Sequence, residues 1–406
     1  MENSRPCDGI KVLAVTSALA APFAAYQLAL HGAEVISIED PGTGNSTRRA
    51  GSVEGKNLSE QGMAAGFIAH AANKKSLTLN LREPAAQEIF KKLARDADVI
   101  LENFRAGTMD RYGLGYEAMR ELNPRIVYCS LSGFGQTGPK RRDPAIDPII
   151  QAASGMMSLT GTPQSGPLKV GAQIADYVSG FSLALGIMMA LFQRERTGEG
   201  QRVDVSMLES AIVAMSNTVS DVINTGMPTR LMGNKLQNNN HLCDTFSCSD
   251  APIFIGATRE NLRQKLWQAM GRPDIPADPR FTNLKAMQQN LEALYAEINR
   301  TLRTRTAGEW EDVLSQAGVP AMQVRSIAEI TEHPQIRHRK LFHTIDKATS
   351  GLGQDIRVPL APYKLSRGAA RIDSPPPMLG RHTDEILAGL GYSNEEIVRM
   401  RATGVV

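Results

Sequence analysis

An aspartate at the start of an apolar helix is the residue of this sequence best placed for covalent chemistry. Asp176 lies in Gly171-Ala-Gln-Ile-Ala-Asp-Tyr-Val-Ser-Gly180, directly before an apolar run that predicts a buried helix from Tyr177. Aspartate is a favoured N-cap, so its side chain can serve simply to cap that helix. A carboxylate aimed rigidly from a helix start in an apolar setting can also act as a nucleophile and form a covalent intermediate. The local sequence favours the cap, and the two roles are compatible.

The loops that follow the predicted strands are rich in glycine, hydroxyl groups and arginine. In open α/β sheets, ligands bind beyond the carboxyl ends of the strands. Small residues let backbone N–H groups approach phosphates, and arginine binds phosphate oxygens, so these loops fit a phosphate-bearing ligand as well as ordinary turns with solvated arginines. In order along the chain they contain Thr16–Pro22, Asp40–Arg48, Arg82, Asn103-Phe104, and Ser132–Lys140 followed by Arg141 and Arg142.

Several common catalytic signatures are missing from the sequence. Gly133, Gly135 and Gly138 fit GxGxxG, but Pro139 and a basic cluster follow them and the preceding strand is not the first of its unit, which argues against a dinucleotide site. No GxSxG, HExxH or P-loop pattern occurs.

Metal binding is not expected. His241, Cys243 and Cys248 lie close together in the sequence, but their spacing fits no common zinc motif and no fourth ligand is evident. With Cys7 and Cys129 they make four cysteines and no CxxC pair, which indicates reduced thiols and a cytoplasmic location.

Composition is that of an ordinary globular protein. The 406 residues are 42% hydrophobic and 21% charged, with 45 Lys plus Arg against 42 Asp plus Glu. A net charge of +3 on a chain of this length does not indicate a nucleic-acid partner. The uncharged stretch 12–30 contains Pro22 and lacks a basic leader, so we expect a buried strand and helix there and no membrane insertion.

Short apolar runs alternate with helical patterns through the first 210 residues, which predicts a mostly parallel sheet covered on both faces. The predicted strands are Ile10–Val15, Glu34–Glu39, Ser76–Leu81, Asp98–Asn103, Arg125–Ser132 and Arg202–Ser206, and the predicted helices are Pro22–Leu30, Pro84–Arg95, Thr108–Leu122 and Tyr177–Glu195. After about residue 225 a small α+β block follows, and the chain becomes rich in Gly and Pro from about 345 to 380. Two short helices close the molecule.

The order of motifs resembles the family III CoA-transferases, a group that contains formyl-CoA transferase and carnitine CoA-transferase and is related to α-methylacyl-CoA racemase. The matching pieces span nearly the whole chain: Asp8–Leu13, Gly32–Ile36, Pro41–Gly44, Asn73–Ser76, Asp98–Phe104, Leu122–Arg125, Ser132–Pro139, Ala175-Asp176, Thr197–Gln201, Val203–Ser206 and Leu379–Glu385. Their common order is far more specific than any single motif.

The resemblance implies an architecture that periodicity does not reveal. Family members have a large Rossmann-like domain with a parallel sheet, built from both ends of the chain, and a small α+β domain on two linkers. Two chains interlock into a homodimer. Carried onto this sequence, the resemblance implies a large domain over 1–210 and 351–406, linkers over 211–225 and 331–350, and a small domain over 226–330.

The chemistry that the resemblance implies is transfer of CoA from an acyl-CoA donor to a free carboxylic acid. By the family pattern Asp176 attacks the donor thioester, forms a mixed anhydride and then an aspartyl-CoA thioester. CoA is a substrate here, and no permanently bound cofactor is implied. The family's CoA contacts fall on Ser17, Ala18, Leu19, Ala20, Leu79, Asn80, Arg82, Asn103, Phe104, Arg111 and Lys140.

Three departures from the pattern of formyl-CoA transferase bear on the substrate. Leu19 stands where that enzyme has glutamine, Asp40 where it has a CoA-contacting arginine, and the region 231–242 shows no counterpart of its glycine-rich flap. These differences argue against a formyl/oxalate pair. Arg48 or Arg230 could instead bind the second carboxylate of a dicarboxylic acid, or be a structural or solvated arginine. Succinyl-CoA, which several relatives use, is the expected donor.

Two other functions compete with transfer. Racemisation needs acid/base groups on both faces of the substrate carbon. The family's racemases use a histidine where this chain has Ile146, and a glutamate near the position of Arg259, so racemisation is not favoured. A CoA-binding homologue without turnover is the third hypothesis, and the presence of Asp176 argues against it.

Overall fold

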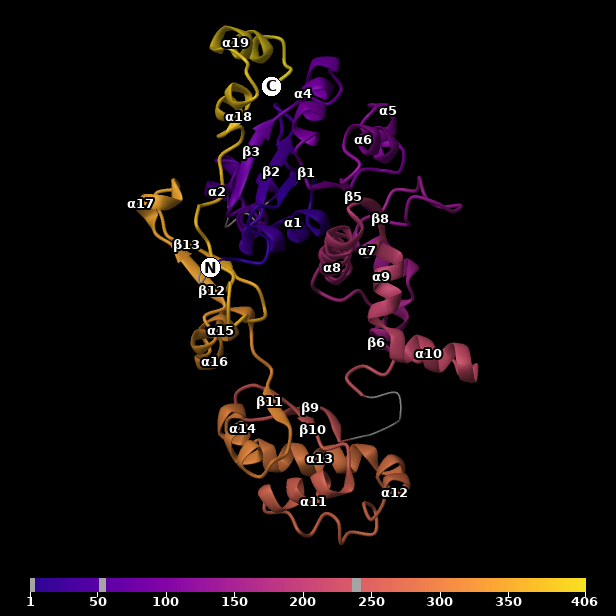
Figure 1. Ribbon diagram of the computed structural model, residues 1–406. Helices are drawn as coiled ribbons and strands as arrows, with labels where there is room; N and C mark the ends of the chain where they lie inside the picture. Colours follow the sequence, from indigo (N-terminus) through magenta and orange to yellow (C-terminus); the bar gives the residue numbers. More distant parts are fainter. Residues whose placement is uncertain (1–3, 51–55, 236–241) are drawn as a thin grey trace. The chain divides into compact units, whose positions relative to one another are not determined.

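The computed structural model describes residues 4–50, 56–235 and 242–406. The chain forms two compact units (Figure 1). The first comprises Met1–Met156, Lys169–Val219 and Arg339–Val406, and the second Met157–Leu168 and Ser220–His338. The sequence analysis assigned the segment 157–168 to the large domain, but the segment groups with the second unit, where Gly233 donates a backbone hydrogen bond to Gly161.

Secondary structure alternates between strands and helices in the first unit and is mostly helical in the second. The strands are β1 (Lys11–Val15), β2 (Glu34–Glu39), β3 (Lys74–Thr78), β4 (Val99–Glu102), β5 (Val127–Ser132), β6 (Gly161–Thr162), β7 (Gly166–Pro167), β8 (Gln201–Ser206), β9 (Cys243–Ser247), β10 (Pro252–Gly256), β11 (Ala321–Gln323), β12 (Phe342–Ile345) and β13 (Ile356–Pro359). The α-helices are α1 (Ala20–Leu30), α2 (Lys56–Glu60), α3 (Ala65–Ile68), α4 (Pro84–Ala94), α5 (Thr108–Arg111), α6 (Tyr116–Leu122), α7 (Asp147–Ala153), α8 (Ile174–Thr197), α9 (Met207–Ala214), α10 (Ser216–Thr225), α11 (Glu260–Ala269), α12 (Leu284–Gln289), α13 (Leu291–Leu302), α14 (Ala307–Gln316), α15 (Ile327–Glu332), α16 (Pro334–His338), α17 (Lys347–Ser350), α18 (Thr383–Gly389) and α19 (Asn394–Ala402).

A six-stranded sheet of order β3-β2-β1-β4-β5-β8 forms the centre of the first unit, and every neighbouring pair in it is parallel. The predicted parallel α/β sheet is therefore confirmed. Apolar side chains of alternating strand residues enter two cores, one on each face: Val12 and Val99 pack with α1 and α8, whereas Leu13 and Ile100 pack with α4, α6 and α18. The winding changes direction between β1 and β4, where an open parallel sheet leaves a crevice for a ligand.

The largest differences from the predicted bounds concern three elements. The third strand lies at Lys74–Thr78, earlier than predicted. The predicted helix Thr108–Leu122 is broken into α5 and α6, because Gly113 adopts a left-handed φ of 67° between them. Helix α8 begins at Ile174, three residues before the predicted start at Tyr177.

The C-terminal segment returns to the first unit and packs beside β3. His382 donates its backbone N–H to Ser76 O, and Thr383 Oγ1 accepts a hydrogen bond from the backbone N–H of Thr78. Figure 1 shows α18 and α19, in yellow, on the β3 side of the sheet. The resemblance implied a large domain built from both ends of the chain, and the contacts of α18 supply that connection.

The second unit has its own core. Strands β9, β10 and β11 form an antiparallel sheet of order β11-β10-β9. Trp267 of α11 and Trp310 of α14 are buried in its apolar cluster, and Trp310 Nε1 donates to Leu302 O. Thr306 and Glu309 form a capping box that opens α14.

Helix α8 is the one helix among the described residues that is long and apolar enough to cross a membrane, by length and composition. Leu183 and Ile187 are fully buried in the core beside the sheet. On its other side Leu185, Met189 and Phe192 are each 59% exposed. One face of the helix thus packs in the core of the first unit, and the opposite face is apolar but exposed.

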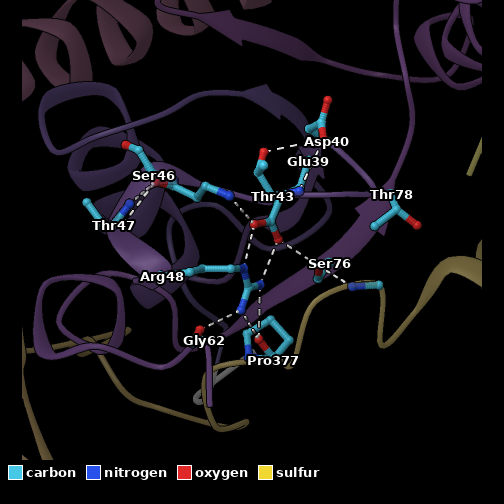
Figure 2. Close-up of polar contacts among 12 residues, drawn as sticks. Glu39, Asp40, Thr43, Ser46, Thr47, Arg48, Gly62, Ser76, Thr78 and Pro377 are labelled. Carbon is cyan, nitrogen blue, oxygen red and sulfur yellow. Dashed lines mark hydrogen bonds and ion pairs between the residues drawn. The ribbon is translucent and has the colours of Figure 1, made fainter. Parts of the chain in front are cut away.

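A buried ion pair ties the second strand to the loop after it (Figure 2). Arg48 is 2% exposed, and its Nε and Nη2 donate to the two carboxylate oxygens of Glu39 at 2.7 and 2.8 Å. The guanidinium also donates to the carbonyl oxygens of Gly62 and Pro377 and lies 3.8 Å from the ring centroid of Phe67. Burial alone would raise the pKa of Glu39, but the hydrogen bonds from Arg48 hold that pKa below its ordinary value.

Removing one partner of this pair leaves the other as an uncompensated buried charge. We therefore expect Arg48→Ala to lower the free energy of unfolding by about 3–5 kcal/mol in a urea titration. Arg82→Ala is the matched control, because Arg82 is an exposed arginine 3.7 Å from Asp40 and its loss should cost at most about 0.5 kcal/mol. Equal destabilisation by the two substitutions would contradict a structural role for Arg48.

Candidate active site

A cavity of about 530 Å³ opens at the carboxyl edge of the six-stranded sheet. Its walls come from the loops after β1 and β4, the end of β5, the segment before α7, and the starts of α8 and α9. The lining residues are Ala18, Ala20, Asn103, Phe104, Arg105, Leu131, Ser132, Gly133, Arg141, Asp143, Pro144, Ala145, Ile146, Asp147, Ile149, Asp176 and Met207. The cavity lies at the switch between β1 and β4, where the topology predicts a ligand site.

Asp176 lines this cavity from the first turn of α8 and is half-buried. Burial, together with the nearby negative charge of Asp147, raises the pKa of Asp176 to about 6. At pH 7 most of the population still carries a charged, nucleophilic carboxylate. Below pH 6 the carboxyl group becomes protonated and loses that reactivity.

The N-cap role predicted for Asp176 is not what the structure shows. Residue 173 occupies the cap position, and Asp176 lies inside the helix. The carboxylate that receives the free N–H groups of this helix belongs to Asp147, whose Oδ2 accepts from the backbone N–H of Ala175 at 2.8 Å and of Asp176 at 3.2 Å. The side chain of Asp176 is thus released from capping and faces the cavity.

Asp147 is itself held in place. It is 4% exposed, and its Oδ1 accepts from Nε2 of Gln151 at 2.6 Å. Gln151 is fully buried, and its Oε1 accepts from the backbone N–H of Val170 at 2.8 Å. This chain of bonds fixes the start of α8, and with it the backbone from which Asp176 projects.

The loop after β1 is clamped by the residue that follows β4. Asn103 Oδ1 accepts from the backbone N–H of Ser17 at 2.9 Å, and its Nδ2 donates to Ser17 O at 2.8 Å. The next residue, Ala18, has a left-handed φ of 60°, which costs a non-glycine residue about 1–2 kcal/mol. The clamp therefore maintains a strained backbone in the wall of the cavity. Four of the residues predicted to contact CoA line this cavity together with Asp176: Ala18, Ala20, Asn103 and Phe104.

The other predicted CoA contacts lie outside this cavity. Leu79 is buried in the apolar core, and Asn80 donates its backbone N–H to Val405 O. Arg82 and Arg111 are exposed, and Lys140 pairs with Asp143 at 2.8 Å. Leu19 and Ser17 lie on the loop after β1 without lining the cavity. The roles of these residues toward CoA stay predictions.

The two arginines predicted to bind substrate have different surroundings. Arg48 does not line the cavity, and its guanidinium is engaged by Glu39, Gly62 and Pro377 inside the core. This placement corrects the substrate role, because a guanidinium enclosed by its own protein cannot bind a carboxylate from solution. Arg230 is an exposed residue of the second unit, and its role stays a prediction.

Sequence reasoning missed several cavity residues. Asp147 is one of them, although Asp followed by Pro at a helix start was a usable signal. Arg105 is another, an exposed cationic residue of the lining that nothing local distinguishes from an ordinary loop residue. Arg141 and Ser132, by contrast, belong to the strand-end loop that the sequence analysis named as suited to a phosphate-bearing ligand.

No group of three or more potential metal ligands occurs among the described residues. Cys243 and Cys248 are buried free thiols, and burial raises the pKa of both. His241, the third residue of the zinc alternative, lies outside the described residues.

A doubly wound sheet with an ionisable carboxylate in a cavity at its carboxyl edge is the arrangement of an enzyme that acts on a small ligand. Comparison with known proteins gives the particular family. The model of the family described as "CoA-transferase family III" matches residues 7–383, and the chain belongs to that family. It is accordingly an acyl-CoA:carboxylate CoA-transferase by class, and the predicted family is confirmed.

Known relatives agree with this membership. An acetyl-CoA:oxalate CoA-transferase from Acetobacter aceti is 37% identical over 338 residues, which cover 83% of this chain and 85% of that protein. A succinyl-CoA–D-citramalate CoA-transferase from Chloroflexus aurantiacus is 33% identical and covers 99% and 98% of the two chains. A solved CAIB/BAIF family protein from Brucella suis superposes with a TM-score of 0.84 at 31% identity, over 95% of this chain and all of that chain.

Neutralising Asp147 should lower the pKa of Asp176 from about 6 toward its ordinary value of 3.8, because a nearby negative charge is removed. The measurement is a carboxyl carbon-13 NMR titration of Asp147→Asn, with the Asp176 resonance assigned by its loss in Asp176→Asn. Asp143→Asn is the control, since Asp143 also lines the cavity but does not act on that pKa. An unchanged titration in Asp147→Asn, or the same shift in Asp143→Asn, would contradict the electrostatic coupling.

Proposed function

We propose that this protein moves CoA from an acyl-CoA donor to a free carboxylic acid, with Asp176 as the nucleophile. The observation that carries the proposal is the carboxylate of Asp176 in the cavity, freed from helix capping by Asp147. Its pKa, raised to about 6 by burial and by Asp147, still leaves it mostly ionised at neutral pH and makes it a stronger nucleophile than an ordinary aspartate. Family membership supports the same chemistry.

The reaction proceeds through covalent intermediates on Asp176. One carboxylate oxygen attacks the carbonyl carbon of the donor thioester, the C–S bond breaks, and CoA leaves as a thiolate, so that a mixed anhydride remains. The thiolate then attacks the aspartyl carbonyl carbon and releases the donor acid, which leaves an aspartyl-CoA thioester. The acceptor carboxylate repeats these steps in reverse, and every bond broken is balanced by one formed.

The cavity must protect these activated acyl groups from water. Its lining includes the apolar side chains of Ile146, Ile149 and Met207. Such walls exclude water and strengthen electrostatic interactions inside the site. The nucleotide end of CoA carries phosphates, and the exposed arginines Arg105 and Arg141 at the same cavity are suited to bind them.

Short dicarboxylic acids are the proposed exchange partners, with succinyl-CoA as the donor. The names of relatives support this class: one is named for succinyl-CoA and D-citramalate, another for oxalate. Oxalate therefore belongs in the acceptor panel, despite the departures from formyl-CoA transferase at Leu19 and Asp40. With Arg48 enclosed in the core, Arg230 remains the predicted partner for a second carboxylate.

We also propose an interlocked homodimer in the cytoplasm, with no nucleic-acid or membrane partner. The apolar face of α8 supports the dimer, because Leu185, Met189 and Phe192 lie together on one exposed face and contiguous apolar patches often mark interaction sites. Four free, buried cysteines are consistent with a reducing compartment. CoA enters as a substrate rather than as a resident cofactor.

Trapping the intermediate tests the nucleophile. With succinyl-CoA alone, the protein should gain a covalent adduct by intact-mass analysis, and peptide mapping should place it on Asp176. Hydroxylamine should then inactivate the protein by attacking the activated carboxyl group. The rate of CoA release should fall as the pH drops through about 6, because the carboxylate becomes protonated.

Asp176→Asn should lower transfer roughly 10⁴-fold or more, the scale expected when a covalent nucleophile is removed. Ser182→Ala, on the same helix and with its hydroxyl bonded to Val178 O, is a control that should stay active. Transfer by Asp176→Asn at the rate of the unchanged protein would contradict the proposed mechanism.

The dimer is tested by light scattering after gel filtration. The expected mass is twice 44.1 kDa, with no dissociation on dilution. Leu185→Asp should reduce the yield of dimer, because it places a charge in the buried interface. Val398→Asp is the control at an exposed apolar residue of α19, and it should leave the dimer intact. A monomeric unchanged protein would contradict the proposal.

A further inference from the structure

A buried hydroxyl in the cavity has no hydrogen-bond partner. Ser132, the last residue of β5, is 9% exposed, and its Oγ makes no hydrogen bond with any part of the chain that the structure describes. Leaving a buried polar group unpaired costs about 1–3 kcal/mol, so the position would be more stable with alanine if it served packing alone. The hydroxyl therefore calls for a partner that binds from outside the chain.

The other residues of β5 have clear structural roles. Val127, Cys129 and Leu131 pack in the apolar core on one face of the sheet. Ser130 is buried and hydrogen-bonds the carboxyl group of Glu102. Among the described residues of β5, Ser132 alone has a polar side chain that both lacks a hydrogen-bond partner and lines the cavity of Asp176.

Most other polar groups of the cavity are already used. The side-chain amide of Asn103 forms hydrogen bonds with the backbone N–H and carbonyl oxygen of Ser17, and both oxygens of Asp147 accept hydrogen bonds from the chain. Asp143 pairs with Lys140. The hydroxyl of Ser132 is thus a neutral donor in a cavity where the nucleophile itself can only accept.

We infer that the Ser132 hydroxyl donates a hydrogen bond to the carbonyl oxygen of the bound acyl thioester. This inference rests on the proposed function. When Asp176 adds to the thioester carbon, the C=O double bond becomes single and its oxygen gains negative charge. A donor fixed at a strand end, in a cavity with apolar walls, stabilises that charge without reorganisation. Ser132 keeps its proton throughout, and no bond forms to its oxygen.

Burial favours the carbonyl oxygen over the pantetheine amides as the acceptor. The thioester must reach the half-buried Asp176, so the reacting end of CoA occupies the inner part of the cavity. Ser132 lines the same cavity and is nine-tenths buried, which suits a contact with that inner end better than a contact at the exposed mouth. The contact would therefore be specific to acyl-CoA and absent with free CoA.

Kinetics of the first half-reaction provide one test. With succinyl-CoA in a single turnover, Ser132→Ala should release CoA roughly 10- to 100-fold more slowly, the loss expected for one donor to a developing oxyanion. Its dissociation constant for free CoA, measured by calorimetry, should stay within about twofold of that of the unchanged protein. Ser132→Thr should restore most of the rate, because it restores the hydroxyl.

Ser210→Ala is the matched control. Ser210 is 7% exposed and does not line the cavity, and its hydroxyl donates to the carbonyl oxygen of Ser206, the N-cap of its own helix. It should retain the rate of the unchanged protein. Equal losses in the two alanine variants, or weaker binding of free CoA by Ser132→Ala, would overturn the inference in favour of a structural role or a pantetheine contact.

A binding test separates this inference from the proposed function, because it needs no turnover. In the Asp176→Asn background, succinyl-CoA should bind roughly 2- to 10-fold more tightly than S-(3-carboxypropyl)-CoA, which lacks only the thioester carbonyl oxygen. Adding Ser132→Ala should abolish that preference. A preference that survives the substitution, or is absent from the start, would overturn the inference whatever the outcome of the transfer assays.

Discussion

The site depends on two carboxylates at the start of α8 that have different roles: Asp147 caps the helix, and Asp176 lines the cavity. Asp147 accepts the N–H groups of Ala175 and Asp176, and it is held by Gln151 in turn. Because that carboxylate satisfies the helix terminus, the side chain of Asp176 can face the cavity without leaving N–H groups unpaired. The negative charge of Asp147 also raises the pKa of Asp176, together with burial. Asp147 therefore helps to fix the position of the proposed nucleophile and adds to the effect of burial, which is the larger cause of its raised pKa.

The remaining walls of the site are tied to the sheet in the same manner. Asn103 at the end of β4 holds Ser17, and through it the left-handed backbone of Ala18. A hydrogen bond between the hydroxyls of Ser17 and Ser46 links this loop to the one after β2. The Glu39–Arg48 pair anchors that second loop in the core. Buried polar contacts of this kind specify one arrangement of loops that would otherwise have several.

Much of the first unit could be predicted because its signals are local. Apolar runs bounded by charged or glycine residues predicted the six strands of the sheet to within a few residues, and alternation with helices predicted their parallel order. The resemblance in motif order pointed to Asp176, which the structure places in the cavity. The left-handed Gly113, which divides α5 from α6, was less visible because helical periodicity continues on both sides of it.

Long-range contacts explain what could not be predicted. Asp147 caps a helix that begins 27 residues later, whereas capping rules consider only neighbouring residues. Arg48 resembles a solvated loop arginine, yet its partners include Glu39 on another element and Pro377 near the other end of the chain. The unpaired hydroxyl of Ser132 likewise emerges only when its surroundings are known.

Oxygen-18 labelling tests the central claim about Asp176 most directly. Succinate labelled in its carboxylates would be incubated with the protein and a different acyl-CoA, and the peptide containing Asp176 would be weighed after digestion. If the acid forms an anhydride with Asp176 and CoA thiolate then attacks the acyl carbon, a labelled oxygen remains in the side chain of Asp176. Labelled product without label in that peptide would show that transfer bypasses Asp176, and would contradict the account.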